Sequence, residues 1–349
     1  MKEYYLSVID GTKKGLLAAM LRRFLEGLSF FYSAGIRLRR YCFDKGHAAA
    51  RELPVPVVSV GNLTWGGTGK TPLVIELAKK VEAMGKKPLV LTRGYGNDEA
   101  KELMENLSPI PVGVGTDRVK TAWKYLTKGK YDIVICDDAF QHWKIDRDWD
   151  ILAVNAFEPF GTGFLIPRGN LREPLEAFRR AQTVVLTHSD KHLGDVARVK
   201  KALLEIAPHL EIAEACHEPM HFYRTVAGEI KPLEFFGHIR AVVFAGIGCP
   251  DAFRRTLEGL GIRIAKFFQF PDHHPFTREE IIEVRDFLFK ENLQDAITTE
   301  KDYFRSKKIL VDILDPWVLK MRMKIKVGER KIEDRLAELM KAGKLKFLD

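Results

Sequence analysis

The sequence contains few cysteines, and they form no recognisable site. Four occur among the 349 residues, without a Cys-x-x-Cys pair or any metal-ligand spacing. They stand at Cys42, Cys136, Cys216 and Cys249. Their scatter argues against a disulfide framework and favours a reducing, cytoplasmic compartment. The opening residues, MKEYYLSVIDG, also lack the charged start and short apolar core of a secretory signal peptide, so we expect none.

Repeats, low-complexity linkers and long uninterrupted apolar runs are absent as well. A membrane-spanning helix needs about 20 mostly apolar residues, and Arg22, Arg23 and Glu26 interrupt the region that comes nearest to this. Hydrophobic residues make up 46% of the chain and charged residues 30%, which is typical of a globular protein and not of a disordered or collagen-like one. A chain of 349 residues favours two domains.

Positive charge is concentrated near the amino terminus. The net charge is +9, and residues 13–46 alone hold eight basic and two acidic side chains. Apolar residues recur there at steps of three and four, which predicts an amphipathic helix. One face carries Leu17, Leu21, Phe24, Leu28, Phe31 and Leu38, and the other Arg22, Glu26, Ser29, Ser33, Arg37 and Arg40. We predict that residues 1–46 bind a membrane surface through this helix, mainly residues 16–40; the alternative is a helix packed on the core or on a partner chain.

A glycine-rich turn follows an apolar, strand-like run in VVSVGNLTWGGTGKTP, residues 57–72. Glycines let backbone N–H groups approach phosphate oxygens, and the helix that follows adds its positive end. We therefore predict a nucleoside triphosphate site in which Lys70 reaches the β- and γ-phosphates and Thr71 ligates Mg²⁺. The strict motif has a glycine where Thr64 stands, so this loop is a variant. The alternative is an ordinary glycine-rich surface loop.

Short apolar runs alternate with helical patterns, which indicates an α/β fold with a parallel sheet and helices on both faces. Strands are expected at 53–60, 88–92, 131–136, 150–154 and 182–187, with helices at 73–84 and 117–128. The alternation of strand and helix patterns continues with strands expected at 240–245, 261–269 and 295–299. Near the end of the chain, a strand with one basic face over 319–327 precedes a helix over 329–341. We expect a phosphate-loop domain over 47–188, a smaller α/β domain over 189–315 and a strand–helix segment over 316–349.

Acidic residues follow one of these strands directly, as Asp137 and Asp138. In phosphate-loop proteins such a carboxylate lies beside the loop and holds Mg²⁺. Adjacent residues of a strand point to opposite sides, so only one of the two faces the site squarely, and the sequence leaves the choice open.

Further charged residues are candidates for the chemistry. In the turn-rich segment 167–174, Arg172 is a candidate for γ-phosphate charge and Glu173 for the metal. Transfer to a hydroxyl also needs a carboxylate that accepts the proton, which a histidine can orient. Asp98-Glu99 and Asp272-His273-His274 are the candidates for this pair.

Taken in order, these segments resemble one family, the tetraacyldisaccharide 4′-kinases of lipid A biosynthesis. The matching segments are 59–64, 66–72, 92–96, 115–118, 137–142, 169–174, 244–248, 270–273 and 298–302. They span about residues 55–305 in the family's order, and the family's phosphate loop places its glycines as this one does. The resemblance implies a P-loop kinase that moves the γ-phosphate of ATP to the 4′-hydroxyl of a tetraacylated glucosamine disaccharide 1-phosphate, giving lipid IVA, with ATP and Mg²⁺ as cofactors.

The resemblance also implies roles for individual residues. Asp98 matches the catalytic base and His273 its partner, with His274 as the alternative. Lys70 would act in catalysis, and the loop that binds ATP comprises Thr64, Trp65, Gly66, Gly67, Thr68, Gly69, Lys70 and Thr71. Mg²⁺ would be held by Thr71, Asp138 and Glu173. The nucleotide and lipid headgroup would be lined by Arg93, Tyr95, Arg118, Gln141, His142, Asn170 and Arg172.

The partners implied are the lipid disaccharide and, through residues 16–40, the cytoplasmic face of the Gram-negative inner membrane, bound peripherally. No nucleic acid or obligate protein partner is expected. One departure concerns the base: family members carry an insert with hairpin character before it, whereas Tyr95 and Asp98 are three residues apart here. The alternative function is a P-loop ATPase or GTPase switch. Thr187-His188-Ser189-Asp190 lacks the lysine of the guanine-specific Asn-Lys-x-Asp motif, which argues against GTP.

Overall fold

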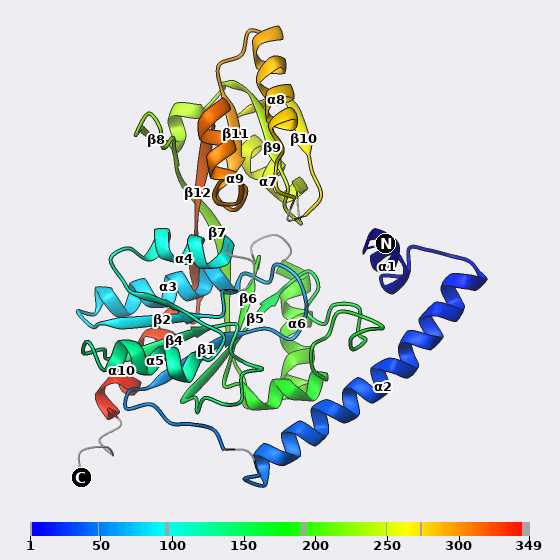
Figure 1. The fold of residues 1–349 in the computed structure, drawn as a ribbon, viewed down its shortest axis with the longest axis vertical. Coiled ribbons are helices and arrows are strands. Elements are labelled where there is room, and N and C mark those ends of the chain that lie inside the picture. Colours follow the sequence, from blue (N-terminus) through cyan, green and yellow to red (C-terminus); the bar gives the residue numbers. More distant parts are fainter. Residues whose placement is uncertain are drawn as a thin grey trace. The chain divides into compact units, whose positions relative to one another are not determined.

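The computed structural model describes residues 2–47, 49–94, 98–189, 193–248, 250–272 and 274–343. Contacts divide the chain into two compact units, drawn as a ribbon in Figure 1. The first unit comprises Met1–Gly94, Leu107–Cys216 and Lys324–Asp349, and the second comprises Tyr95–Asn106 and His217–Met323. Each unit therefore contains segments that are distant in sequence.

The first unit contains a parallel sheet whose strand order is β7-β6-β5-β1-β4-β2-β3. Its strands are β1 (Val57–Gly61), β2 (Pro88–Thr92), β3 (Val112–Val114), β4 (Ile133–Asp137), β5 (Trp149–Asn155), β6 (Thr183–Thr187) and the start of β7 (Glu211–Tyr223). Strands β1, β2, β4 and β6 are buried along their whole length, which explains why they read as continuous apolar runs. The carboxyl ends of β1 and β4, which are neighbours, meet at one edge.

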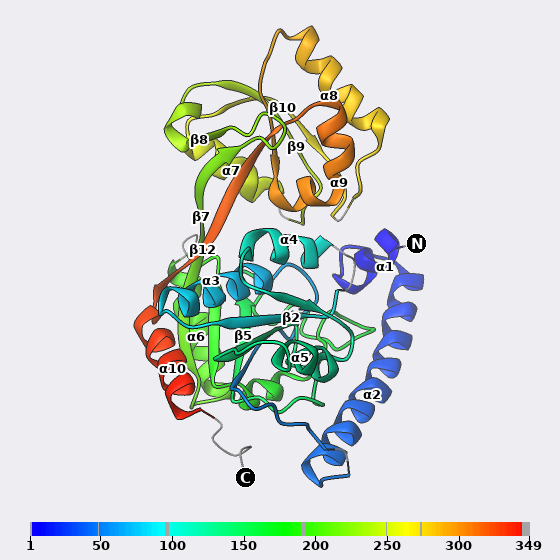
Figure 2. The ribbon, with the colours of Figure 1, turned by 60° about the vertical axis from the view of Figure 1, so that its left-hand side comes forward.

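Helices cover this sheet. Figures 1 and 2 show α3 (Lys70–Ala83) and α5 (Arg118–Leu126) on opposite sides of β2. On the α5 side, Val119 and Ala122 join a buried apolar cluster with Leu89, Leu91 and Val134 of the sheet. The remaining helices of the unit are α1 (Lys2–Ile9), α2 (Leu16–Asp44), α6 (Leu193–Ile206), α10 (Glu329–Ala342) and the short 3₁₀ helix η1 (Leu175–Arg180).

Helix α2 meets the rest of the first unit along a narrow stripe, because the protein-facing positions are Ala18, Leu25 and Ser29, all buried. The Ser29 hydroxyl donates to the Leu165 carbonyl at 2.9 Å and accepts from the Arg168 amide at 3.0 Å. Most of the apolar residues of α2 face away from this stripe and are exposed. Within the described ranges, no helix has both the length and the apolarity needed to cross a membrane.

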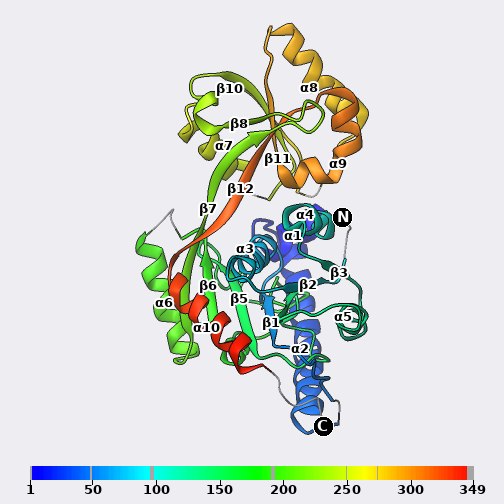
Figure 3. The ribbon, with the colours of Figure 1, turned by 90° about the vertical axis from the view of Figure 1, so that its left-hand side faces the viewer.

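The second unit has its own parallel strands in the order β10-β9-β11-β12. They are β9 (Arg240–Ala245), β10 (Arg263–Gln269), β11 (Ala296–Thr299) and β12 (Trp317–Val327), and β8 (Ile230–Pro232) pairs antiparallel with β7. Helices α7 (Pro250–Gly259), α8 (Arg278–Lys290) and α9 (Glu300–Ile313), the 3₁₀ helix η2 (Leu233–Phe236) and the helix α4 (Asp98–Leu107) complete it, apart from the last residue of α4. Figure 3 shows β7 and β12 as two long neighbouring strands.

The predicted fold class, a P-loop type α/β fold with a mostly parallel sheet, is confirmed. The limits of the two units differ from the expected domain limits. The first parallel sheet continues through β6, α6 and the start of β7, so the first unit extends to Cys216 rather than to residue 188. The helix α4, expected inside the phosphate-loop domain, belongs to the second unit instead, apart from its last residue.

Candidate active site

The loop between β1 and α3 has the backbone of a phosphate cradle. Gly66 and Gly69 adopt φ angles of 111° and 82°, in the left-handed region that favours glycine. The Trp65 amide donates to the Asn170 carbonyl at 2.8 Å, and the Thr187 hydroxyl donates to the Thr68 carbonyl at 3.0 Å. The loop is therefore fixed from the segment around Asn170 and from the end of β6.

Three features of this loop fit a triphosphate. The N-cap of α3, Gly69, has no side-chain capping bond, and the first turn of α3 contains no acidic residue. A Cβ atom built on Gly66 or on Gly67 would meet no atom within 4 Å, so the space above both residues is open. Backbone N–H groups at the start of a helix that face open space are the donors that phosphate oxygens bind. Thr71, in the first turn, is largely buried.

Asp138 lies at the centre of the charged groups beside this loop. Its carboxylate binds the Arg172 guanidinium through two bonds of 2.6 and 3.0 Å, and the Lys70 ammonium lies 4.0 Å away. Arg172 also donates to the Asn62 side-chain oxygen at 3.0 Å. Burial alone would raise the pKa of Asp138, but the bonds from Arg172 and the charge of Lys70 outweigh it and lower the pKa. Asp138 is thus an ionised carboxylate between two cations.

The backbone explains why Asp138, and not Asp137, faces Lys70. Asp138 adopts φ 47°, a left-handed conformation that is uncommon for a residue with a side chain and turns the chain as β4 ends. The buried Asp137 accepts instead from the Thr92 hydroxyl at 3.2 Å. Arg118, itself buried, donates to the carbonyls of Asp137 and Asp138 at 2.6 and 2.9 Å and holds this turn. The geometry therefore favours Asp138 as the residue beside the phosphate loop.

Glu173 is buried and ion-paired with Arg180, 2.8 Å apart. Burial raises the pKa of Glu173, although the guanidinium of Arg180 acts in the opposite direction. Arg180 also stacks on the rings of Phe140 and Trp143, 4.2 and 5.0 Å from their centroids. Glu173, which is predicted to hold the metal ion, is thus paired with Arg180 in this structure.

The residues predicted to line the nucleotide and lipid headgroup site have different surroundings. Gln141 donates to the Asn62 carbonyl at 3.0 Å, and His142 follows on the same turn, where burial and then the charge of Arg118 lower its pKa to about 4. His142 is therefore a neutral imidazole at physiological pH. Asn170 instead organises its own loop: its side-chain oxygen accepts from the Thr162 amide at 2.9 Å. Arg93 is exposed just after β2.

The acid/base candidates belong to the second unit. Tyr95 and His273 lie outside the described residues, and Asp98 begins α4 while its side chain is outside the description. The His274 imidazole bonds to the Glu280 carboxylate at 2.9 Å and stacks on Phe270. The structure thus brings Lys70, Asp138 and Arg172 together, while the roles of Asp98 and His273 stay predictions.

No group of three or more His, Cys, Asp or Glu side chains is placed to hold a metal ion in the part of the chain that the structure describes. This arrangement is compatible with Mg²⁺ in a kinase, which is held by one or two carboxylates together with substrate phosphates and water. The residues Thr71 and Asp138 fit such a site. Asn62 also belongs to this site, through its bond from Arg172. Its position directly after β1 is the signal in the sequence that could have indicated this.

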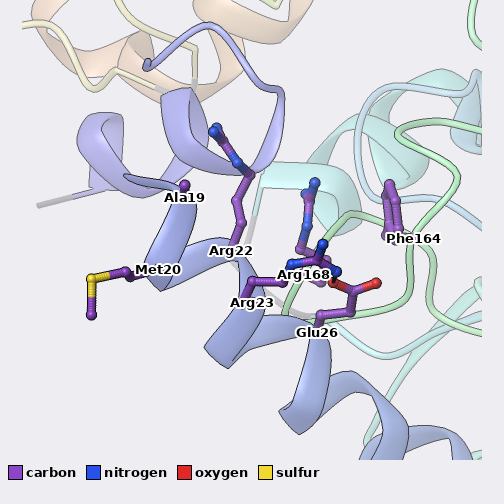
Figure 4. A pocket seen from close by; sticks show the side chains of 7 residues that line it. All are labelled: Ala19, Met20, Arg22, Arg23, Glu26, Phe164 and Arg168. Atoms are coloured by element: carbon purple, nitrogen blue, oxygen red, sulfur yellow. Dashed lines mark hydrogen bonds and ion pairs between the residues drawn. The ribbon is translucent and has the colours of Figure 1, made fainter. Parts of the chain in front are cut away.

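A second feature of the first unit is a groove of about 660 Å³ between α2 and the loop before Asn170 (Figure 4). It is lined by Ala19, Met20, Arg22, Arg23, Glu26, Phe164 and Arg168. The Arg168 guanidinium lies 4.2 Å from the centroid of the Phe164 ring and donates to the Ile9 carbonyl at 3.1 Å. The groove therefore combines apolar surface with a surplus of positive charge.

Comparisons with known proteins agree on one family. The family model described as tetraacyldisaccharide-1-P 4′-kinase matches residues 21–341. The tetraacyldisaccharide 4′-kinase of Syntrophus aciditrophicus is 33% identical over 91% of this chain and 93% of its own length. A probable mitochondrial tetraacyldisaccharide 4′-kinase of Arabidopsis thaliana is 32% identical over 96% of this chain and 95% of its own. The crystal structure of LpxK from Aquifex aeolicus in complex with ATP matches with a TM-score of 0.72 at 29% identity, covering 92% of this chain and 99% of that one.

Proposed function

Since this chain belongs to the tetraacyldisaccharide 4′-kinase family, we propose that the cluster of Lys70, Asp138 and Arg172 binds the triphosphate of ATP for transfer to a lipid. The protein is an ATP-dependent kinase of lipid A biosynthesis, and it phosphorylates the 4′-hydroxyl of a tetraacyldisaccharide 1-phosphate. The alternative of a P-loop ATPase or GTPase switch is not favoured by the family match. What remains to be assigned is the role of each residue.

The observation that carries the proposal is the position of Asp138 between two cations. Phosphoryl transfer requires positive groups around the γ-phosphate, where negative charge develops on the equatorial oxygens. Lys70 lies 4.0 Å from Asp138, and Arg172 holds the same carboxylate through two bonds. A phosphate that approaches this cluster meets two cations whose geometry Asp138 has already fixed. Both would then be available to the β- and γ-phosphates, and Asp138 would be available to hold Mg²⁺.

Mg²⁺, when bound, would neutralise the charge that develops on the phosphates. The residues we assign to it are Thr71, Asp138 and Glu173. Asp138 is the strongest of these, because it is ionised and lies beside the loop. To hold the metal, Glu173 would first have to break its ion pair with the guanidinium of Arg180. We assign the acceptance of the 4′-hydroxyl proton to Asp98, oriented by His273, on the basis of their positions in the family's motifs.

Substituting Arg172 with methionine tests whether this arginine faces the γ-phosphate. We expect ATP to bind about 10- to 100-fold more weakly, because a hydrogen bond to a charged group contributes about 1.5–3 kcal/mol. The affinity for ADP, which has no γ-phosphate, should change far less. Isothermal titration calorimetry with both nucleotides measures the difference.

Arg179→Met is the matched control, because Arg179 is exposed and its side chain donates to the Ile206 carbonyl at 2.9 Å. It should leave both affinities unchanged. Equal weakening of ATP and ADP by Arg172→Met would place Arg172 elsewhere in the site. Thermal unfolding of each variant shows whether the fold around Asp138 is kept.

We infer that α2 binds the membrane surface from which the acceptor lipid is taken. The residues predicted as its apolar face are mostly exposed: Leu17 by 77%, Phe24 by 64% and Phe31 by 72%. The stripe that contacts the protein includes Ser29, from the face predicted to be polar. Burial in the core of this chain therefore does not account for the apolar face, and an interfacial helix with arginines at the headgroups does.

The groove of Figure 4 supports a role for α2 in holding the acceptor. It is built from the inner edge of α2 and the loop that carries Phe164 and Arg168. Farther along the same loop, the Arg172 carbonyl accepts a hydrogen bond from the Tyr32 hydroxyl of α2 at 3.0 Å. We propose that the arginines of the groove attract the anionic headgroup while Met20 and Phe164 contact acyl chains.

Substituting Phe24 and Phe31 with glutamate should release the protein from membranes. Each exposed phenylalanine contributes about 1.5–3 kcal/mol when it is buried in the acyl boundary, so the double variant should partition at least about 100-fold less. Flotation with vesicles of phosphatidylcholine and phosphatidylglycerol measures the partition. The control is Phe289→Glu, which alters an equally exposed phenylalanine on α8. Undiminished flotation of the double variant would assign membrane binding to another surface.

A further inference from the structure

Two carboxylates with little exposure, Glu300 and Asp302, lie two residues apart where β11 passes into α9. Thr299 caps α9: its hydroxyl accepts from the Asp302 amide and bonds to the Asp302 carboxylate at 2.7 Å. The side chains of Glu300 and Asp302 are 12% and 0% exposed. Burying a carboxylate is costly unless it is paired, so the partners of these two residues indicate their purpose.

Glu300 is connected to the helix that carries Asp98. The Lys320 ammonium, from β12, binds the Glu300 carboxylate at 2.6 Å and also donates to the side-chain oxygen of Asn106. Asn106 lies in the last turn of α4, which begins at Asp98. The Tyr223 hydroxyl donates to the same carboxylate at 3.3 Å, which fixes it further. The carboxyl end of α4 is therefore attached to β12 and α9 through partly buried polar groups.

The bonds at the carboxyl end of α4 also affect the position of its amino-terminal end. A helix rises 1.5 Å per residue, so Asn106 lies about 12 Å along the axis from Asp98, over two turns of rigid backbone. A small rotation at the attachment moves the start of the helix. A misplacement of about 1 Å of a catalytic group can cost about 100-fold in rate.

Asp302 is connected to the segment that carries His273. Its carboxylate accepts from the Gly246 amide at 3.1 Å and pairs with Arg305 at 2.9 Å. The same Arg305 nitrogen donates to the Gly246 carbonyl at 3.2 Å and to the carbonyl of His274, the residue after His273, at 3.3 Å. A Cβ on Gly246 would lie 3.2 Å from the Pro271 carbonyl, so these segments are in close contact.

We propose that Glu300 and Asp302 are positioning residues: through Lys320 and Arg305 they fix the two segments that carry the base Asp98 and its partner His273. The inference rests on the proposed function, which assigns those two roles. It gives a purpose to the segment Thr298–Asp302, which matches the family and to which we assign no role in ATP binding. It also gives a reason for α4 to belong to the second unit.

Lys320→Met and Asn106→Ala test the link to α4. We expect each to lower kcat for phosphate transfer about 10- to 100-fold while the KM for ATP stays within about twofold, because the base is displaced and the phosphate loop is untouched. Lys320→Arg should restore most of kcat. Asn106→Ala leaves the pair of Lys320 and Glu300 in place, so it remains informative if Lys320→Met unfolds.

Arg322→Met is the matched control, because Arg322 lies two residues along β12 and pairs with Glu218, on an exposed site. It should keep kcat. The double variant Asp98→Asn/Lys320→Met should be little slower than Asp98→Asn alone, because both changes act on one group. Unchanged kcat in both Lys320→Met and Asn106→Ala would overturn the proposal. Full activity of Asp98→Asn would instead overturn the assignment of the base.

Discussion

Substitution of Asp98 with alanine is expected to lower kcat for phosphate transfer by about 100- to 10,000-fold, the range for loss of a general base. The KM for ATP should change by no more than a few-fold, because we assign the triphosphate to the loop between β1 and α3. The physical reason is that the 4′-hydroxyl must lose its proton as it attacks, and we assign Asp98 as the carboxylate that accepts it. Initial rates at saturating ATP and lipid measure the effect.

Glu99→Ala is the control for this prediction, since it removes the neighbouring carboxylate from the same turn of α4. It should keep kcat within about threefold of the wild type, the scatter expected for a residue outside the chemistry. A near-normal kcat for Asp98→Ala, or an equal loss in both variants, would move the base to another residue. Family members carry an insert before the base, whereas Tyr95 and Asp98 are only three residues apart here. The comparison of the two variants therefore tests directly which carboxylate is the base.

Substitution of Lys70 with alanine should lower kcat by about 100- to 1,000-fold, as expected when one preorganised donor to developing charge is removed. Asp138 keeps its two bonds to Arg172, so the carboxylate is not left unpaired and the fold should survive. Lys79→Ala, which alters an exposed lysine on the same helix, is the control and should retain activity. Activity of Lys70→Ala near that of the wild type would show that the loop does not hold the reacting phosphates.

The sequence predicted the strands of the first unit well because they are buried on both faces. β1, β2, β4 and β6 read as short apolar runs, since no position along them meets water. β7 was not predicted, because half-buried and exposed residues interrupt its apolar ones over 13 residues. The three-residue β3 is too short to give a pattern.

The phosphate loop and the acidic strand end could be predicted to lie together, because β1 and β4 are neighbours in a parallel sheet. The choice of Asp138 over Asp137 depends on a left-handed φ angle and on bonds from Arg118, which lies about 20 residues earlier. The pairing of Glu173 with Arg180 likewise depends on how η1 packs. Such contacts follow from the tertiary fold and leave no periodic signal in the sequence.

The amphipathic pattern of α2 defined two faces but not their surroundings. Periodicity reports which residues share a face, and it cannot distinguish burial in a core from burial in a lipid surface. The structure distinguishes them in part, because Ser29 lies against the protein while Phe24 and Phe31 are exposed. What covers those exposed residues is the subject of the vesicle experiment.

The most direct test of the central claim follows the γ-phosphate of ATP to its acceptor. The purified protein is incubated with γ-labelled ATP, Mg²⁺ and tetraacyldisaccharide 1-phosphate in detergent micelles, and the lipid is extracted into organic solvent. We predict label in the extracted lipid at the 4′ position, in amounts equal to the ADP formed, and almost none with Lys70→Ala. Release of labelled inorganic phosphate from ATP with no label in the lipid would contradict the account.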